Sequence, residues 1–183
     1  NNFNLSSFIF SSSCTVYGEP SCIPVNEKTP IQPAFSPYGY TKQVGEKILT
    51  DFFKTKKQTS LTILRYFNPI GAHPSSLIGE LPLGVPSNLV PHLTQTAIGK
   101  RKQLTIFGND YNTADGTCIR DYIHVVDLAR AHVLSLKNKI MSNNIYNVGI
   151  GKGSSVLELV NCFEEINNLN VNYQFGDRRS GDI

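Results

Sequence analysis

Residues 5–18 read LSSFIFSSSCTVYG, an apolar run that passes directly into a cluster of hydroxyl side chains. The run from Leu5 to Ser11 is short and bounded by serines, which is typical of a buried strand in a parallel sheet. The hydroxyl cluster from Ser11 to Gly18 would follow the carboxyl end of this strand, where open α/β sheets bind their ligands. Ordinary turn chemistry explains a serine cluster equally well. The stretch therefore predicts a strand and leaves the role of its serines open.

The next segments along the chain predict a helix and a second strand. Residues 20–37 are rich in proline and read as a loop, which ends in a good N-cap, Ser36, followed by Pro37. We expect a helix from Pro37 to about Lys54, in which Gly45 would allow close packing. Its apolar row consists of Val44, Ile48 and Phe52, beside Gly45 and Leu49. An amphipathic helix usually faces the core with such a row.

Leu61 to Phe67 (LTILRYF) form a second short run of β-branched and aromatic residues, which predicts another strand. The order strand, helix, strand implies a right-handed crossover in a parallel sheet. Further along, residues 104–107 (LTIF) predict an exposed-edge strand. Residues 144–148 (NIYNV) predict a strand that precedes an amphipathic helix.

The composition describes one ordinary globular domain or a large part of one, with 183 residues, 40% of them hydrophobic and 17% charged. A net charge of +3 is too small to argue for nucleic acid. The four cysteines are scattered without C-x-x-C spacing, which favours reduced thiols in a cytosolic protein. The sequence has neither a membrane-length apolar run nor a signal peptide. It begins at Asn1 without methionine and ends at Ile183 after a charged stretch, so we interpret it as a fragment.

Tyr38 and Lys42 are the first candidate catalytic residues. In a helix that begins at Pro37 they lie one turn apart on the same face. A free tyrosine is a poor base at neutral pH, but an ammonium one turn away favours its phenolate, and a second nearby cation would favour it further. The Tyr-x-x-x-Lys pattern alone is weak, because a packed tyrosine beside a solvated lysine gives the same spacing.

Several motifs follow one another along the chain, and together they carry more weight than any one of them. They are SSSCTVYG, SPYGYTK, LRYFNPIGAHPSS, GVPSNLVPHLTQTAIGKRKQLTIFGNDYNTADGTCIRDYIHVVDLARAHV, NIYNVGIGKG and DRRSGD. In this ordered set the chain resembles the sugar-nucleotide epimerases of the extended short-chain dehydrogenase/reductase family over essentially its whole length. The resemblance implies an α/β fold. Residues 1–68 would form the C-terminal half of a Rossmann-type doubly wound parallel sheet that binds NAD, and residues 69–183 a smaller, truncated α/β domain that binds the UDP-sugar.

The activity that the resemblance implies is reversible NAD-dependent epimerisation of UDP-glucose and UDP-galactose at C4, through a 4-keto intermediate, in galactose metabolism. Tyr38 would take the proton of the 4-hydroxyl, Ser13 would relay it, and Lys42 would hold the nicotinamide ribose, with Phe67 lining the same cofactor site. The parent would be a cytoplasmic homodimer without nucleic-acid or membrane partners. The alternatives are another UDP-sugar epimerase, acting on UDP-N-acetylglucosamine or a UDP-pentose, or a non-catalytic UDP-sugar-binding fragment.

The resemblance also implies the residues that contact the UDP-sugar. Amide and backbone donors at Asn68, Asn88 and Leu89 would bind the diphosphate, whose charge would be neutralised by Arg120 and Arg179. The uracil would lie against the edge strand, at Thr105, Ile106 and Phe107. Asp182 would accept a hydrogen bond from a ribose hydroxyl. Without the resemblance, Phe67 and Phe107 read as core residues and a lone arginine as surface solvation.

Two patterns suggest other sites. Residues 147–153 (NVGIGKG) look like a dinucleotide fingerprint, but their spacing is G-x-G-x-G, and the family places this segment in the substrate domain as a strand-to-helix turn. His124 and His132 lie near aspartates, of which we interpret Asp127 as the N-cap of a helix through Lys137, so we expect no metal.

The phosphate-binding turn of the family belongs before Asn1, so we expect the 183-residue chain alone to be inactive. Related sugar 4,6-dehydratases carry Asp-Glu where this chain has Cys14 and Thr15, and related decarboxylases keep the glutamate. The resemblance therefore favours epimerisation over dehydration or decarboxylation.

Overall fold

The computed structural model describes residues 5–56, 58–137 and 143–179, and these fall into two compact units. The first unit comprises Asn1–Pro69 and Ile123–Gly151, and the second comprises Ile70–Tyr122 and Lys152–Ile183. The division differs from the single boundary expected at residue 68, since the chain leaves the first unit there and later returns to it. It returns because a strand after residue 143 pairs within the first sheet.

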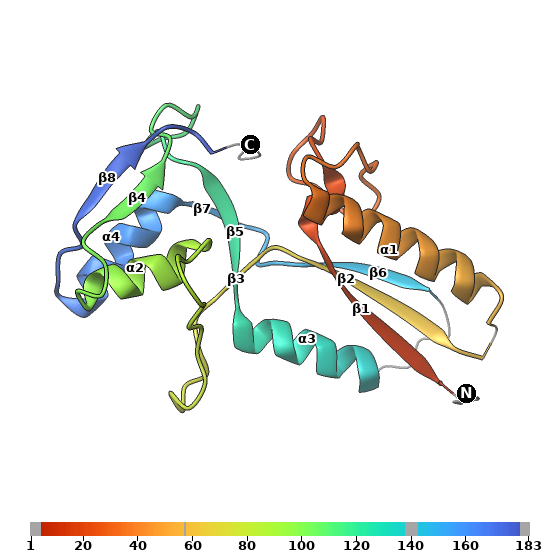
Figure 1. The fold of residues 1–183 in the computed structure, drawn as a ribbon. Helices are drawn as coiled ribbons and strands as arrows, with labels where there is room; N and C mark the ends of the chain where they lie inside the picture. Colours follow the sequence, from red (N-terminus) through yellow and green to blue (C-terminus); the bar gives the residue numbers. More distant parts are fainter. Residues whose placement is uncertain (1–4, 57, 138–142, 180–183) are drawn as a thin grey trace. The chain divides into compact units, whose positions relative to one another are not determined.

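The first unit is built on a parallel sheet of three strands in the order β1-β2-β6. The strands are β1 (Ser7–Ser13), β2 (Ser60–Tyr66) and β6 (Asn144–Val148). Helices α1 (Pro37–Lys54) and α3 (Val125–Lys137) lie on opposite sides of this sheet (Figure 1). Its register places Ser13 beside Tyr66 and Tyr66 beside Val148, so the carboxyl ends of all three strands meet at one edge.

Local sequence signals predicted this strand–helix–strand order correctly. Strand β1 extends to Ser13, two residues beyond the predicted end, and the next residues form a short 3₁₀ helix, η1 (Cys14–Tyr17). Helix α1 has the predicted limits, and the Ser36 hydroxyl caps it by accepting the Gly39 N–H at 3.1 Å.

The apolar row of α1 does not pack on the sheet. Val44, Ile48 and Phe52 are exposed, Ile48 to 62%. Gly45 does allow the expected close approach, because a Cβ there would lie 2.7 Å from Cζ of Phe10. The face toward the sheet carries Leu49 and Phe53, which pack with Leu61 and Ile63 of β2. It also carries Glu46, since the buried Arg65 of β2 requires a counter-charge.

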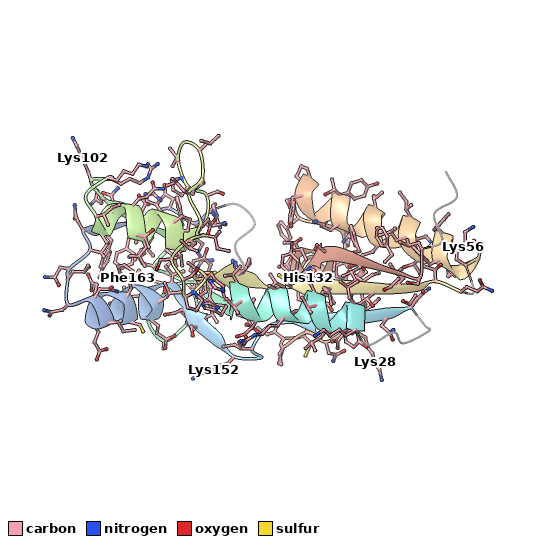
Figure 2. The ribbon with its side chains drawn as sticks, turned by 90° about the horizontal axis from the view of Figure 1, so that it is seen from below. Lys28, Lys56, Lys102, His132, Lys152 and Phe163 are labelled. Atoms are coloured by element: carbon pink, nitrogen blue, oxygen red, sulfur yellow. The ribbon has the colours of Figure 1, made fainter. Side chains whose placement is uncertain are left out.

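The second unit contains the parallel pair β4 (Leu104–Phe107) and β8 (Tyr173–Gly176), with helices α2 (Leu89–Ala97) and α4 (Val156–Asn167) against it. Phe163 lies on the side of α4 toward α2 (Figure 2). The buried core of this unit consists of Leu93, Leu104, Ile106, Val160 and Val171. The predicted LTIF strand and the amphipathic helix are both confirmed.

Short strands β3 (Asn68–Ile70) and β5 (Ile119–His124) lie where the chain changes units, and β7 (Gly153–Ser155) pairs antiparallel with β5. Two expectations about neighbouring segments are wrong. Strand β6 belongs to the first unit rather than to the substrate domain, because it pairs with β2. Asp127 is not an N-cap, because α3 begins two residues earlier, where the Val126 N–H donates to Nδ1 of His124 at 3.2 Å. Among the helices of the described ranges, none is long and apolar enough to span a membrane.

Candidate active site

Helix α1 brings Tyr38 and Lys42 together at its first turn. Nζ of Lys42 donates to the carbonyl oxygen of Ser11 at 2.8 Å and lies 5.4 Å from the centroid of the Tyr38 ring. The same ammonium lies 5.4 Å from the ring centroid of Phe10. Tyr38 is 51% exposed, so its phenol is open to a ligand. The lysine is thus fixed by the end of β1 while it holds its positive charge beside the tyrosine.

Ser13 is the last residue of β1 and is 6% exposed. Its Oγ accepts the Thr15 N–H at 3.2 Å and the Thr15 hydroxyl at 3.0 Å, which makes Ser13 the N-cap of η1. Both contacts use Ser13 as the acceptor, so its own O–H retains the capacity to donate. Phe67 follows β2, is half-buried, and donates its N–H to the Val148 carbonyl at 3.1 Å.

Sequence reasoning missed Tyr66 as a member of this site. Burial raises the pKa of the Tyr66 hydroxyl, the proximity of Tyr38 raises it further, and a hydrogen bond with Ser11 opposes the rise. Oγ of Ser11 also lies 2.9 Å from Nε2 of His132, which points from α3 toward the sheet (Figure 2). No local sequence signal could have found it, since Tyr66 enters the site through the non-local pairing Ser13↔Tyr66 of two parallel strands.

The donors at this edge suit a nicotinamide nucleotide. An ammonium, a buried serine hydroxyl and a phenol match the hydroxyl-rich ribose and the carboxamide of such a group. These residues fit the nicotinamide half of NAD. The pyrophosphate would need a glycine-rich turn at a helix N-terminus, and the sequence contains no G-x-G-x-x-G.

The glycines before α4 do not supply such a turn. The first three N–H groups of α4 donate to the chain itself, namely Val156 to the Cys118 carbonyl at 3.0 Å, Leu157 to the Thr117 hydroxyl at 3.2 Å and Glu158 to Oγ of Ser155 at 2.9 Å. The Glu158 carboxylate accepts the Ser155 N–H in return, and Asp115 accepts the Ser155 hydroxyl. Occupied donors beside two carboxylates exclude a phosphate there.

The N-terminus of α2 in the second unit is a better anion site. Asn88 is its N-cap but makes no side-chain capping bond, and its Nδ2 donates to Oε1 of Glu80 at 3.0 Å. Nη1 of Arg179 donates to the Ser87 carbonyl at 3.3 Å, and its guanidinium lies 5.7 Å from the Phe107 ring centroid. A helix N-terminus and an arginine at the same place favour an anion such as a diphosphate.

The remaining predicted residues lie as follows. Thr105 and Ile106 precede Phe107 on β4, but Ile106 is 1% exposed, so only its backbone is available to a ligand. Arg120 lies on β5, and its Nη1 donates to the Ile119 carbonyl at 2.9 Å. Asn68 begins β3 and is exposed. Asp182 lies outside the described residues.

The comparisons agree with this geometry. The family model described as "NAD dependent epimerase/dehydratase family" matches residues 1–149, and the chain belongs to that family. Its fold matches the crystal structure of the UDP-glucose 4-epimerase from Bifidobacterium longum in complex with NAD+ and UDP, with a TM-score of 0.93 and 44% identity. The match covers 98% of this chain and 54% of that one.

Curated relatives named UDP-glucose 4-epimerase are similar along nearly the whole chain. The protein of Haemophilus influenzae is 52% identical over 178 residues, which are 96% of this chain and 53% of the relative. The protein of Bacillus subtilis is 51% identical over 183 residues, covering 99% and 54% respectively. The chain therefore spans about half the length of the curated relatives it matches.

Proposed function

We propose that the whole protein interconverts UDP-glucose and UDP-galactose at C4, with NAD as its cofactor, through a 4-keto intermediate. The observation that carries the proposal is the pair Tyr38 and Lys42 at the start of α1, with Lys42 fixed to the Ser11 carbonyl. The names of relatives about 50% identical support the same activity. We also infer that the first unit serves the cofactor and the second the nucleotide.

Four residues of the first unit would act at the cofactor and the reacting carbon. Lys42, Ser13, Tyr38 and Phe67 would hold the nicotinamide half of NAD, which supplies a reversible hydride acceptor. Tyr38, whose ring centroid lies 5.4 Å from Nζ of Lys42, takes the proton of the sugar 4-hydroxyl. Ser13 donates to the same sugar oxygen and relays the proton, since its two contacts with Thr15 leave its O–H available.

The other proposed residues bind the nucleotide. Arg179 and Arg120 neutralise the phosphates, with the backbone N–H groups at Asn88 and Leu89 completing the anion site. Phe107 stacks on the uracil, and backbone groups of Thr105 and Ile106 read its edge. Asn68 would contribute a further amide to the diphosphate, and Asp182 would accept a ribose hydroxyl.

Replacing Tyr38 with phenylalanine in the whole protein tests the proposal. We expect kcat for UDP-galactose to fall about 10²–10⁴-fold, the usual range for a lost general base, with little change in UDP affinity. Tyr40→Phe is the matched control, because Tyr40 lies on the same helix and is 62% exposed, and it should keep normal turnover. Near-normal turnover of Tyr38→Phe would show that another residue is the base.

We further propose that the whole protein is a cytoplasmic homodimer of galactose metabolism. The described part of α1 exposes the row Tyr40, Val44, Ile48 and Phe52, and a second copy of the same helix would cover it. No disulfide joins the four cysteines, all of which lie in the described ranges, and this suits a reducing compartment.

A further inference from the structure

The sheet-facing side of α1 carries an ion pair that the proposed mechanism does not use. Glu46 is 5% exposed and Arg65 is 3% exposed. Nη2 of Arg65 donates to Oε2 of Glu46 at 2.5 Å. Nε of Arg65 donates to Oε1 of the same carboxylate at 2.9 Å, which completes a two-pronged contact between β2 and α1. The hydroxyl of Ser12 donates a third hydrogen bond to Oε1 at 2.5 Å.

The network continues from Arg65 to the other elements of the first unit. Nη1 of Arg65 donates to the Tyr17 hydroxyl at 3.1 Å, and this hydroxyl donates to Oδ1 of Asn147 at 2.6 Å. The guanidinium also lies 4.9 Å from the centroid of the Tyr17 ring. Through these contacts β1, η1, α1, β2 and β6 share one connected polar cluster.

The position of Glu46 relates the cluster to the candidate active site. Glu46 follows Lys42 by one turn on the same face of α1. Two neighbouring residues of β1 hold these two side chains, the carbonyl of Ser11 holding Lys42 and the hydroxyl of Ser12 holding Glu46. Any rotation or sliding of α1 over the sheet would break both contacts at once.

Stability alone is a poor explanation for such a pair. Burying two charges costs about as much as their attraction returns, and a well-packed apolar pair often does equally well. The best-attested use of a buried polar pair is to fix the register of one element against another. Gly45 against Phe10 lets the helix approach, and Leu49 and Phe53 pack on the sheet further along α1, whereas the Glu46 pair lies one turn from Lys42.

We propose that Glu46, held by Arg65 and Ser12, is a positioning residue that fixes α1 in rotation and translation, so that Tyr38 and Lys42 stay in place beside the end of β1. This inference rests on the proposed function, because it assigns Glu46 a purpose in that reaction. Glu46 is 5% exposed, so its role is assigned through α1 and not through contact with substrate or cofactor.

The test compares three variants of the whole protein. The double variant Glu46→Leu/Arg65→Met removes both charges and refills the space with apolar atoms, so it should melt close to the wild type. Glu46→Gln keeps the shape but leaves Arg65 without its counter-charge, so it should melt lower. Asp51→Asn is the control, since Asp51 makes only exposed pairs with Lys47 and Lys54 on the same helix.

We expect the stable double variant to lose about 10²-fold in kcat, as a misplacement of about 1 Å can cause, with KM for UDP-galactose unchanged and the pH profile of kcat displaced. Amide hydrogen exchange should become faster at residues 38–42 of the double variant, with or without ligands. The Asp51→Asn control should match the wild type in every measurement.

A double variant with wild-type kcat, pH profile and amide exchange would overturn the positioning role and leave the pair as packing. The exchange measurement also separates this inference from the proposed function. If the wild-type protein does not epimerise UDP-galactose, the proposed function fails, while faster exchange at residues 38–42 still supports the positioning role and unchanged exchange still overturns it.

Discussion

Three consecutive serines at the end of β1 do three different things. The carbonyl of Ser11 fixes Lys42, the hydroxyl of Ser12 donates to Glu46, and Ser13 caps η1. Side chains alternate along a strand, so Ser11 also reaches His132 on α3 while Ser12 reaches α1. The serine cluster is therefore structural, and ordinary turn chemistry accounts for Ser13 but not for Ser11 and Ser12.

Arg179→Ala should chiefly raise KM for UDP-galactose, by about 10–100-fold, because a hydrogen bond to a charged group contributes about 1.5–3 kcal/mol. Arg178→Ala is the matched control. Arg178 donates to Asp110 at 2.7 Å and lies 4.2 Å from the Tyr111 ring centroid, so its charge is engaged elsewhere. Steady-state kinetics measure kcat and KM of the two variants. A fall in kcat at constant KM in Arg179→Ala would contradict the phosphate role.

The stability that Asp115 contributes should depend on pH. Burial pushes the pKa of its carboxyl up, but hydrogen bonds from Ser155 and Thr117 outweigh this and hold the pKa below its usual range. The folded form thus binds its proton at lower pH than the unfolded chain, which titrates near pH 4. The contribution is complete above about pH 5 and is lost as the pH falls through 4 toward the folded pKa.

Urea unfolding of the wild type and of Asp115→Asn measures this effect. The difference in unfolding free energy should be about 1–2 kcal/mol at pH 7 and should narrow below pH 4. Asp110→Asn serves as the control, because the Asp110 ion pair is exposed and should contribute little at any pH. A difference that stays constant from pH 7 to pH 3 would rule out this source of stability.

At the scale of the element, α1 buries polar side chains beside apolar Leu49 and Phe53 and leaves an apolar row exposed. Gln43 on the buried side donates to the carbonyls of Val16 at 2.9 Å and Gln32 at 2.7 Å, and Glu46 pairs with Arg65. The apolar row on the other side has no cover within the described chain, which is the pattern of an interface helix.

Ile48→Glu should shift the whole protein toward a monomer, because a charge in the centre of an apolar interface is costly to bury. Leu136→Glu is the control, since Leu136 is similarly exposed on α3, at 54% against 62% for Ile48. Sedimentation measures the mass of both variants. An unchanged dimer with Ile48→Glu would show that copies associate elsewhere.

The limits of α1 could be predicted because they depend on local chemistry, the Ser36 cap and Pro37 at the first position. The orientation of its faces could not, since it depends on residues of β2, namely Arg65 with Glu46 and the apolar pair Leu61 and Ile63 with Phe53. The start of α3 was mistaken for a similar reason. The His124 ring caps its first turn, whereas Asp127 looked the better cap from sequence alone.

The candidate site likewise contains residues that the sequence could predict and one that it could not. The spacing of Tyr38 and Lys42 follows from helix geometry, so the sequence predicted their proximity. Tyr66 enters the site only through the pairing of β1 with β2, and β6 joins that sheet from a distant part of the chain. Such non-local pairings leave no periodic signal near the residues they bring together.

At the scale of the whole molecule, we expect epimerisation to be the only outcome of the 4-keto stage. Cys14 and Thr15 lie in η1 directly after Ser13, and neither can replace a carboxylic acid in an elimination. Product analysis with UDP-glucose should therefore show UDP-galactose and no 4-keto-6-deoxy sugar. Accumulation of such a sugar would mean that the reaction class is wrong.

The register of the first sheet also has a consequence for synthesis on the ribosome. Thr62 of β2 pairs with Asn144 of β6, about 80 residues later, and the second unit supplies most of the chain between them. At about 5–20 residues per second, translation takes roughly 4–16 s to deliver β6. For that time one edge of β2 stays open and can pair with other nascent chains. A pause in translation between residues 70 and 122 lengthens this exposure, so the yield of folded protein depends on the pace of translation as well as on the free energy of the finished fold.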